Sequence, residues 1–138
     1  MNLKEILENS TYTIFPDMYS VAKVSSEFEC KNVFTISKDS LETTAIYKMG
    51  TASTGIIEEK QNYKLIAVNV AVPFYAPGFI ATISSSMADR GIAVLVVSTY
   101  SRDYFIVASK DIRVAMCEME KIGLKELKEL KEKNNGAI

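Results

Sequence analysis

Hydrophobic and polar positions alternate most regularly in the centre of the chain, over residues 64–72. A strand with this sequence places branched aliphatic side chains on one face, namely Ile66, Val68, Val70 and Val72. The opposite face carries smaller or polar residues, namely Leu65, Ala67, Asn69 and Ala71. This asymmetry predicts a sheet that helices cover on one side and that something else approaches on the other. Pro73 ends the strand because proline cannot donate to a sheet ladder.

Apolar positions change to helical spacing after the turn at Pro77 and Gly78, with Ile80, Ile83 and Met87 on one stripe. Gly91 ends this helix, as glycine does just past a helix C-terminus. We then predict a buried strand over residues 92–97, a polar turn over 98–103 and a third strand over 104–108. A second helix begins at about residue 109, with a stripe of Ile112, Ala115, Met116, Met119 and Ile122.

The order strand, helix, strand, strand, helix is that of the ferredoxin-like split βαβ plan, and it lacks only a closing strand. The predicted fold class is therefore α+β. Upstream, residues 1–8 form a short amphipathic turn or helix, and strand-like runs over 12–15 and 19–25 flank the turn signal Pro16-Asp17. A further strand is predicted over 33–36. Residues 41–49 suit either a strand or a helix and we favour a strand, followed by a flexible connection over 50–55.

Leucines recur every three residues after Gly123, at Leu124, Leu127 and Leu130. Glutamates lie three or four residues from lysines in the same segment, which favours a helix. Its narrow apolar stripe needs a surface to lie on. This helix packs either on its own domain, which we favour, or on a second subunit.

Composition narrows the class of function. The 138 residues are 48% hydrophobic, which is enough for one compact domain or two small halves. Sixteen basic residues against seventeen acidic ones give no reason to expect nucleic acid. The chain has no histidine and no nucleophile, metal or phosphate-binding motif, which argues against an enzyme, a metal site or a cofactor.

The two cysteines lie far apart in the sequence, and neither belongs to a metal-ligand or redox motif. Cys117 lies in the pattern of the second helix and is read as a small apolar filler. Thiol-dependent catalysis by Cys30 or Cys117 ranks last among the possible functions. No signal peptide or membrane span is visible, so we expect a cytoplasmic protein.

One corner of the predicted fold suits the carboxylate of a small zwitterion. The turn Ala76-Pro77-Gly78 precedes the helix that begins at Phe79, so backbone N–H groups beside a positive helix end are available for a carboxylate. The alternative is an ordinary turn glycine at Gly78. Asp103 lies at the mouth of the third predicted strand, where the ordinary role of an aspartate is that of a turn residue or of a salt bridge with Arg102.

The same stretch resembles the ACT-domain family of small regulatory modules that bind amino acids. The matching residues are Pro77-Gly78-Phe79, Gly91-Ile92, Ser98-Thr99-Tyr100 and Asp103-Tyr104. It resembles most the branch with tandem ACT-like halves, typified by arginine sensors of the CASTOR type and their small bacterial relatives. The resemblance implies a ferredoxin-like βαββαβ sandwich over residues 61–138 and a divergent, β-rich ACT-like half over residues 1–60.

By the same resemblance, the glycine at Gly78 is a ligand-binding position, Asp103 contacts the bound amino acid, and Thr99 and Tyr100 line its pocket. The predicted ligand-binding residues are Ala76, Pro77, Gly78, Phe79, Thr99, Tyr100 and Asp103. ACT modules place ligands between two copies, which implies a homodimer or an internal pseudo-dimer. The expected function is regulation through a bound amino acid. The alternative is a protein-interaction module with a vestigial pocket that acts through dimerisation.

Overall fold

The computed structural model describes residues 1–129, which contain both helices and strands. In chain order the elements are α1 (Leu3–Glu8), β1 (Thr11–Ile14), β2 (Tyr19–Cys30), β3 (Val33–Lys38), β4 (Thr43–Lys48), β5 (Ala52–Asn69), α2 (Phe79–Ala88), β6 (Leu95–Ser98), β7 (Arg102–Ala108), the 3₁₀ turn η1 (Ser109–Asp111), α3 (Ile112–Lys121) and β8 (Lys125–Glu126). The fold is α+β and ferredoxin-like, as predicted. None of the described helices is long and apolar enough to cross a membrane.

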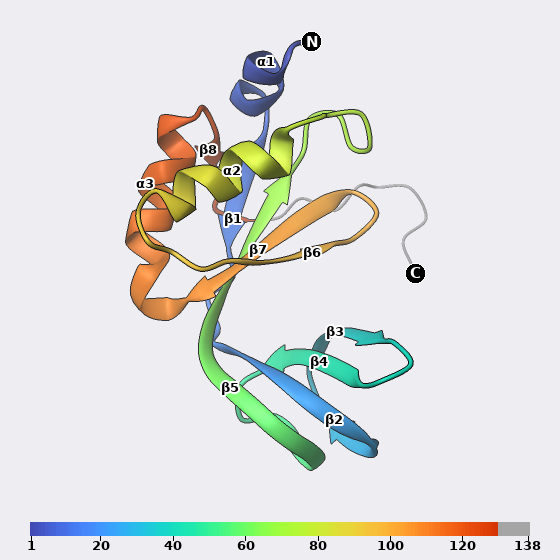
Figure 1. Cartoon of the computed structure of the whole chain (residues 1–138). Coiled ribbons are helices and arrows are strands. Elements are labelled where there is room, and N and C mark those ends of the chain that lie inside the picture. The colour runs from blue at the N-terminus through green and yellow to red at the C-terminus, as the bar shows by residue number, and fades with distance from the viewer. Residues whose placement is uncertain (130–138) are drawn as a thin grey trace.

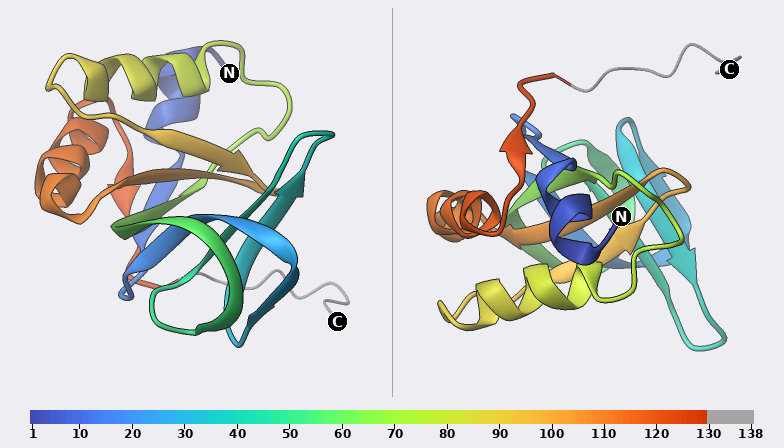
Figure 2. Two further views of the ribbon diagram at one scale, coloured as in Figure 1. Left: turned by 60° about the horizontal axis from the view of Figure 1, so that its bottom comes forward. Right: turned by 90° about the horizontal axis from the view of Figure 1, so that it is seen from above.

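Strand β5 runs the length of the molecule and belongs to both of its parts (Figure 1). Its first half pairs with β2 in a sheet of order β3-β4-β2-β5, which we call the lower sheet. Its second half lies in the order β8-β1-β5-β7-β6, which we call the upper sheet. Helices α2 and α3 cover one face of the upper sheet, and the lower sheet lies beyond the other face (Figure 2).

The two faces of β5 are buried by different elements, which explains the asymmetry of its sequence. Ile66 and Val68 are fully buried in a core with residues of α2 and α3, including Met87. Leu65 is also fully buried, but it lies in a second core with Tyr19 and Ile46 of the lower sheet. The helix-covered face is therefore confirmed, and the element that approaches the other face is the lower sheet.

The strand that completes the upper sheet comes from the start of the chain. Strand β1 pairs antiparallel with the second half of β5, from Thr11 opposite Asn69 to Ile14 opposite Ile66. This is the place beside the central strand that a ferredoxin-like fold gives to its last strand. The segment after Gly123 forms β8, which pairs parallel with β1 and is the outermost strand on that side of the upper sheet.

The leucine-spaced helix predicted after Gly123 is wrong for the described residues. Gly123 has a φ of +118°, and the N–H of Leu124 bonds back to the carbonyl of Met119, which ends α3. The chain then forms β8, and the N–H of Leu127 donates to the carbonyl of Tyr12 over 2.7 Å. Pairing with β1 thus replaces the ion-paired helix that the local pattern favoured. The rest of the predicted helix lies outside the described residues.

Several boundaries differ from the prediction for visible reasons. Strand β5 ends at Asn69 because its antiparallel neighbours β1 and β7 both begin opposite that residue. Strand β6 begins at Leu95, since the N–H of Ile92 still caps α2 by donating to the carbonyl of Met87. Gly91, with a φ of +72°, is the predicted C-terminal glycine of that helix.

The flexible connection predicted over residues 50–55 is wrong, because β5 begins at Ala52. Gly55 lies inside the strand with a φ of +85°, at a place where the pairing of β2 with β5 shifts register between Val24 and Glu29. A residue without a side chain allows the strand to continue through this irregularity. The strand favoured over 41–49 is confirmed as β4, and the short N-terminal helix as α1.

Candidate functional site

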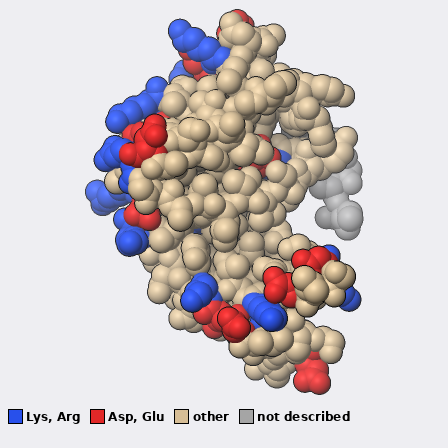
Figure 3. Space-filling view, in the orientation of Figure 1, with Lys and Arg blue, Asp and Glu red and all other residues tan. Residues whose placement is uncertain are grey.

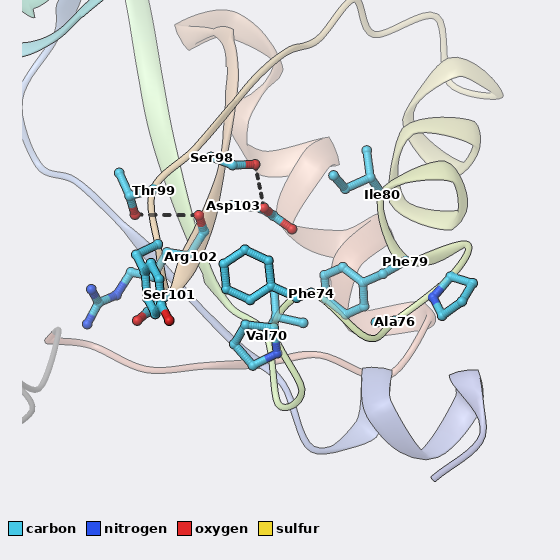
Figure 4. Close-up of a pocket in the computed structure, with 13 residues that line it drawn as sticks. Val70, Phe74, Ala76, Phe79, Ile80, Ser98, Thr99, Ser101, Arg102 and Asp103 are labelled. Atoms are coloured by element: carbon cyan, nitrogen blue, oxygen red, sulfur yellow. Dashed lines mark hydrogen bonds between the residues drawn. The ribbon is translucent and has the colours of Figure 1, made fainter.

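A cavity of about 410 Å³ lies between the loop before α2 and the turn that joins β6 to β7. One wall comes from that loop and the first turn of α2, and its residues are Val70, Pro73, Phe74, Ala76, Pro77, Phe79 and Ile80. The other wall comprises every residue from Ser98 to Asp103. Both walls belong to the upper part of the molecule (Figure 4). Its volume lies within the range of ~300–1,000 Å³ that is typical of small-molecule sites.

The cavity brings together all of the predicted ligand-binding residues except Gly78. Gly78 begins α2 with a φ of +84° and lines a shallower depression beside Thr82. A Cβ atom built on Gly78 would lie 3.4 Å from the side chain of Leu3 in α1. The left-handed backbone at Gly78 thus sets the direction in which α2 starts.

Asp103 is held at the floor of the cavity by its neighbour across the hairpin. Ser98 and Asp103 are opposite each other in the pairing of β6 with β7, and Ser98 Oγ donates to Asp103 Oδ1 over 2.6 Å. In Figure 4 the carboxylate points toward the rings of Phe74 and Phe79. One carboxylate oxygen is therefore fixed by the protein, and the group faces the space that a ligand would occupy.

The turn that carries Asp103 is tight and internally bonded. The N–H of Thr99 donates to the carbonyl of Arg102 over 2.9 Å, and Thr99 Oγ1 lies 3.5 Å from the same carbonyl. Arg102 Nε donates to Asn69 Oδ1 over 2.7 Å, which ties the turn to the end of β5. Asn69 also donates through Nδ2 to Thr11 Oγ1. The corner is thus anchored to β5 and, through Asn69, to β1 before any ligand binds.

The first turn of α2 supplies unpaired donors by its geometry. No side chain caps the helix at Gly78, and the N–H of Phe79 donates to the carbonyl of Ala76 over 3.1 Å. Thr82 makes the first regular bond, from its N–H to the carbonyl of Gly78 over 2.9 Å. The N–H groups of Ile80 and Ala81 precede that bond, so they belong to the donors that a helix start leaves open. Ile80 lines the cavity, whereas Ala81 lines the shallower depression beside Gly78.

Two exposed aromatic side chains meet at the mouth of the cavity. The rings of Phe74 and Tyr100 lie edge to face with centroids 5.1 Å apart, although the side chains are 73% and 82% exposed. Phe74 also has a φ of +70°, which is unusual for a bulky residue. The sequence gives no sign of this backbone conformation. Tyr75, the next residue of the loop, does not line this cavity.

A group of charged side chains that does not line the cavity connects the end of α2 to α3. Glu118, which is nearly buried, lies 3.1 Å from Lys121 Nζ and 3.2 Å from Arg90 Nη1, and it accepts a hydrogen bond from Ser86 Oγ. The hydrogen bond from Lys121 is the main cause that holds the pKa of Glu118 below its ordinary value. This group fixes the helix that forms one wall of the cavity.

The two thiols are free and lie outside the cavity. Cys30 is half-buried with its Sγ 3.1 Å from Thr51 Oγ1. Cys117 is exposed, so its interpretation as an apolar filler is wrong: it lies on the outer side of α3, whereas Ala115 and Met119 face the core. Residues 1–129 contain no group of three or more potential metal ligands.

The face of the molecule that carries α2 and β6 has few charged side chains (Figure 3). Lysine, arginine, aspartate and glutamate instead gather along the α3 side and over the lower sheet. The cavity therefore opens on a largely uncharged part of the surface.

A protein-family model matches the central part of the chain. The ACT domain family model matches residues 58–117, which include both walls of the cavity. No curated protein sequence matches the chain.

Solved structures share the fold at low sequence identity. The protein Atu0741 of Agobacterium tumefaciens superposes with a TM-score of 0.69 at 17% identity, over 91% of this chain and 98% of that one. A Vibrio cholerae protein of unknown function, described as a possible transport protein, superposes with a TM-score of 0.67 at 16% identity, over 88% of this chain and 96% of that one. The regulatory subunit of aspartate kinase from Thermus thermophilus superposes with a TM-score of 0.55 at 7% identity, over 80% of this chain and 95% of that one.

Proposed function

We propose that this chain, which contains an ACT domain at residues 58–117, is a regulatory protein that binds a free amino acid. The family match supports regulation of this kind, and the regulatory subunit of an aspartate kinase shares the fold. The observation that carries the proposal is the position of Asp103 across one cavity from the start of α2.

The two sides of the cavity suit the two charges of an amino acid backbone. The carboxylate of Asp103 is an acceptor for the ammonium group, and Ser98 holds it in place. The N–H group of Ile80, which lines the cavity at the positive end of α2, suits the carboxylate. A hydrogen bond to a charged group contributes about 1.5–3 kcal/mol, which corresponds to roughly a ten- to hundredfold change in affinity.

A second copy of the chain is the better candidate to close the site. All lining residues lie between Val70 and Asp103, so the lower sheet contributes none of them. The proposed homodimer therefore places the mouth of the cavity against a neighbouring copy. An internal pseudo-dimer, in which a divergent N-terminal half completes the site, is the less supported arrangement. We propose no catalytic role for either arrangement.

The test is a binding series with Asp103→Asn, which removes the charge and keeps an oxygen for Ser98. Thermal shift with the proteinogenic amino acids identifies a ligand, because a ligand that binds only the folded state raises its stability. Isothermal titration should then show affinity for that ligand at least about tenfold weaker in Asp103→Asn. Asp89→Asn is the matched control, since Asp89 is exposed at the end of α2 and does not line the cavity. Equal affinity in the two variants would contradict the site.

The alternative is an interaction module with a vestigial pocket. It is favoured by β6, which pairs only with β7 among the described strands and exposes Leu95 and Val96. An exposed strand edge with apolar side chains is a surface to which another chain can add. A stable dimer in light scattering, together with no thermal shift for any amino acid, would favour this function over ligand binding.

A further inference from the structure

We infer that the amino acid bound here has an uncharged aromatic or long aliphatic side chain, which packs on Phe74 and Tyr100 at the mouth of the cavity. This inference rests on the proposed function and concerns the same site. It follows from the charges in the cavity, from its apolar walls and from the pair of aromatic rings formed by Phe74 and Tyr100.

The cavity has no charged group left for an ionic side chain. Asp103 is the only acidic residue among those that line it, and the ammonium of any amino acid needs that carboxylate. Arg102 is the only basic lining residue, its Nε donates to Asn69 Oδ1, and in Figure 4 its guanidinium group points away from the rings of Phe74 and Phe79. A charged side chain would therefore lose its water without gaining a counter-charge, which is costly in a partly enclosed site.

The walls beside Asp103 are apolar. In Figure 4 the carboxylate faces the rings of Phe74 and Phe79, and the side chain of Ile80 lies on the same side of the cavity. An ammonium group bound by Asp103 thus places the neighbouring carbon atoms of the ligand among these side chains. Apolar ligand atoms gain free energy there in proportion to the area that they bury.

Phe74 and Tyr100 come from opposite walls and supply the remaining surface. Both rings are largely exposed, and they touch only edge to face at 5.1 Å. The positive φ of Phe74 keeps its ring beside Tyr100 in spite of an unfavourable backbone conformation. Strained residues of this kind cluster at ligand clamps. A flat or long apolar side chain fits this pair because aromatic rings pack well edge to face or offset.

The competing possibility is a cationic side chain held on the ring faces alone. An arginine or lysine side chain is attracted to the face of a tyrosine or phenylalanine ring without any carboxylate. The experiment must therefore compare ligands of different charge at the same site.

Isothermal titration of the full chain with L-phenylalanine, L-leucine, L-arginine and L-glutamate makes that comparison. We expect L-phenylalanine or L-leucine to bind at least tenfold more tightly than either charged amino acid. In Phe74→Ala and Tyr100→Ala the affinity for the preferred ligand should fall at least fivefold. Tyr75→Ala is the matched control, because Tyr75 is 77% exposed in the same loop but does not line the cavity. Its affinity should not change.

The possible failures are distinct from one another. If arginine or glutamate binds most tightly and Asp103→Asn abolishes that binding, amino-acid binding stands and the apolar specificity is wrong. If phenylalanine binds but Phe74→Ala and Tyr100→Ala behave like Tyr75→Ala, the aromatic pair is not part of the site and the inference is overturned. If no amino acid binds the wild-type chain, the proposed function fails and the inference fails with it. Far-ultraviolet circular dichroism of each variant confirms that loss of binding is not loss of the fold.

Discussion

Gly55 should be among the least replaceable residues outside the core, and Gly55→Ala tests this directly. A Cβ atom at Gly55 would lie 2.4 Å from both the Cα and the N of Phe28, which are backbone atoms that cannot rotate away. Gly50 offers a matched control, because it has nearly the same φ, +84° against +85°, but no atom within 4 Å of an added Cβ. The pair separates the cost of backbone conformation from the cost of the close contact.

The magnitude follows from these two contributions. A left-handed backbone conformation costs an alanine about 1–2 kcal/mol. The smaller conformational entropy of the unfolded alanine variant offsets about 0.4–1 kcal/mol of this cost. Gly50→Ala should therefore lower the free energy of unfolding by roughly 1 kcal/mol or less. Forcing the strands apart at Gly55 adds about 1–3 kcal/mol, as overpacking does, so Gly55→Ala should cost roughly 2–4 kcal/mol. In a chain of this size that lowers the melting temperature by roughly 5–12 °C.

Urea denaturation followed by circular dichroism measures both variants. The free energy of unfolding comes from the midpoint and the slope, and an unchanged slope shows that the two variants can be compared. A loss at Gly55 that does not exceed the loss at Gly50 would refute the reasoning. It would mean that β2 and β5 do not approach each other at Phe28 as closely as described.

Two further predictions concern the helices. Met87→Ala should lower the free energy of unfolding by about 2–5 kcal/mol, because Met87 is fully buried between α2 and the upper sheet. Met87→Leu keeps the volume and should cost less than about 1.5 kcal/mol; equal losses in chemical denaturation would show that packing is not the cause. The pKa of Glu118 in the folded state lies below its ordinary value of 4.5. The interactions of the ionised carboxylate therefore stabilise the fold at pH values above 4.5. This stabilisation is lost as the pH falls from 4.5 through the folded-state pKa. The stability difference between wild type and Glu118→Gln should therefore be largest near pH 7 and shrink in the acid range, and a difference that stays constant down to pH 3 would contradict the ion pairs with Arg90 and Lys121.

The second half of the chain was predictable because its signals are local. Alternation over β5, helical spacing at Ile83 and Met87, and glycine at Gly91 all reflect backbone preferences that act within a few residues. The corner at Asp103 and the start of α2 were identified in the same way, with help from the family resemblance. Their position across one cavity follows from the order of strands in a ferredoxin-like sheet.

The parts that were missed depend on pairing between distant segments. Nothing near Thr11 indicates that it lies opposite Asn69, and nothing near Lys125 indicates that it lies beside Thr11. The leucine pattern after Gly123 favoured a helix because local propensity was the only guide, and the sheet overrode it. The left-handed backbone of Phe74 had no signal either, since glycine and asparagine are the residues that normally mark such a conformation.

The origin of β1 has a practical consequence for anyone who dissects this protein. A fragment cut at the limits of the family match would lose the N-terminal strand that lies against Ile66 and Val68. It would expose the N–H and carbonyl groups of a long apolar strand to any other chain in solution, which is the usual starting point for aggregation. Expression of the upper sheet with its helices therefore has to begin before Thr11, more than forty residues upstream of the segment that sequence similarity marks.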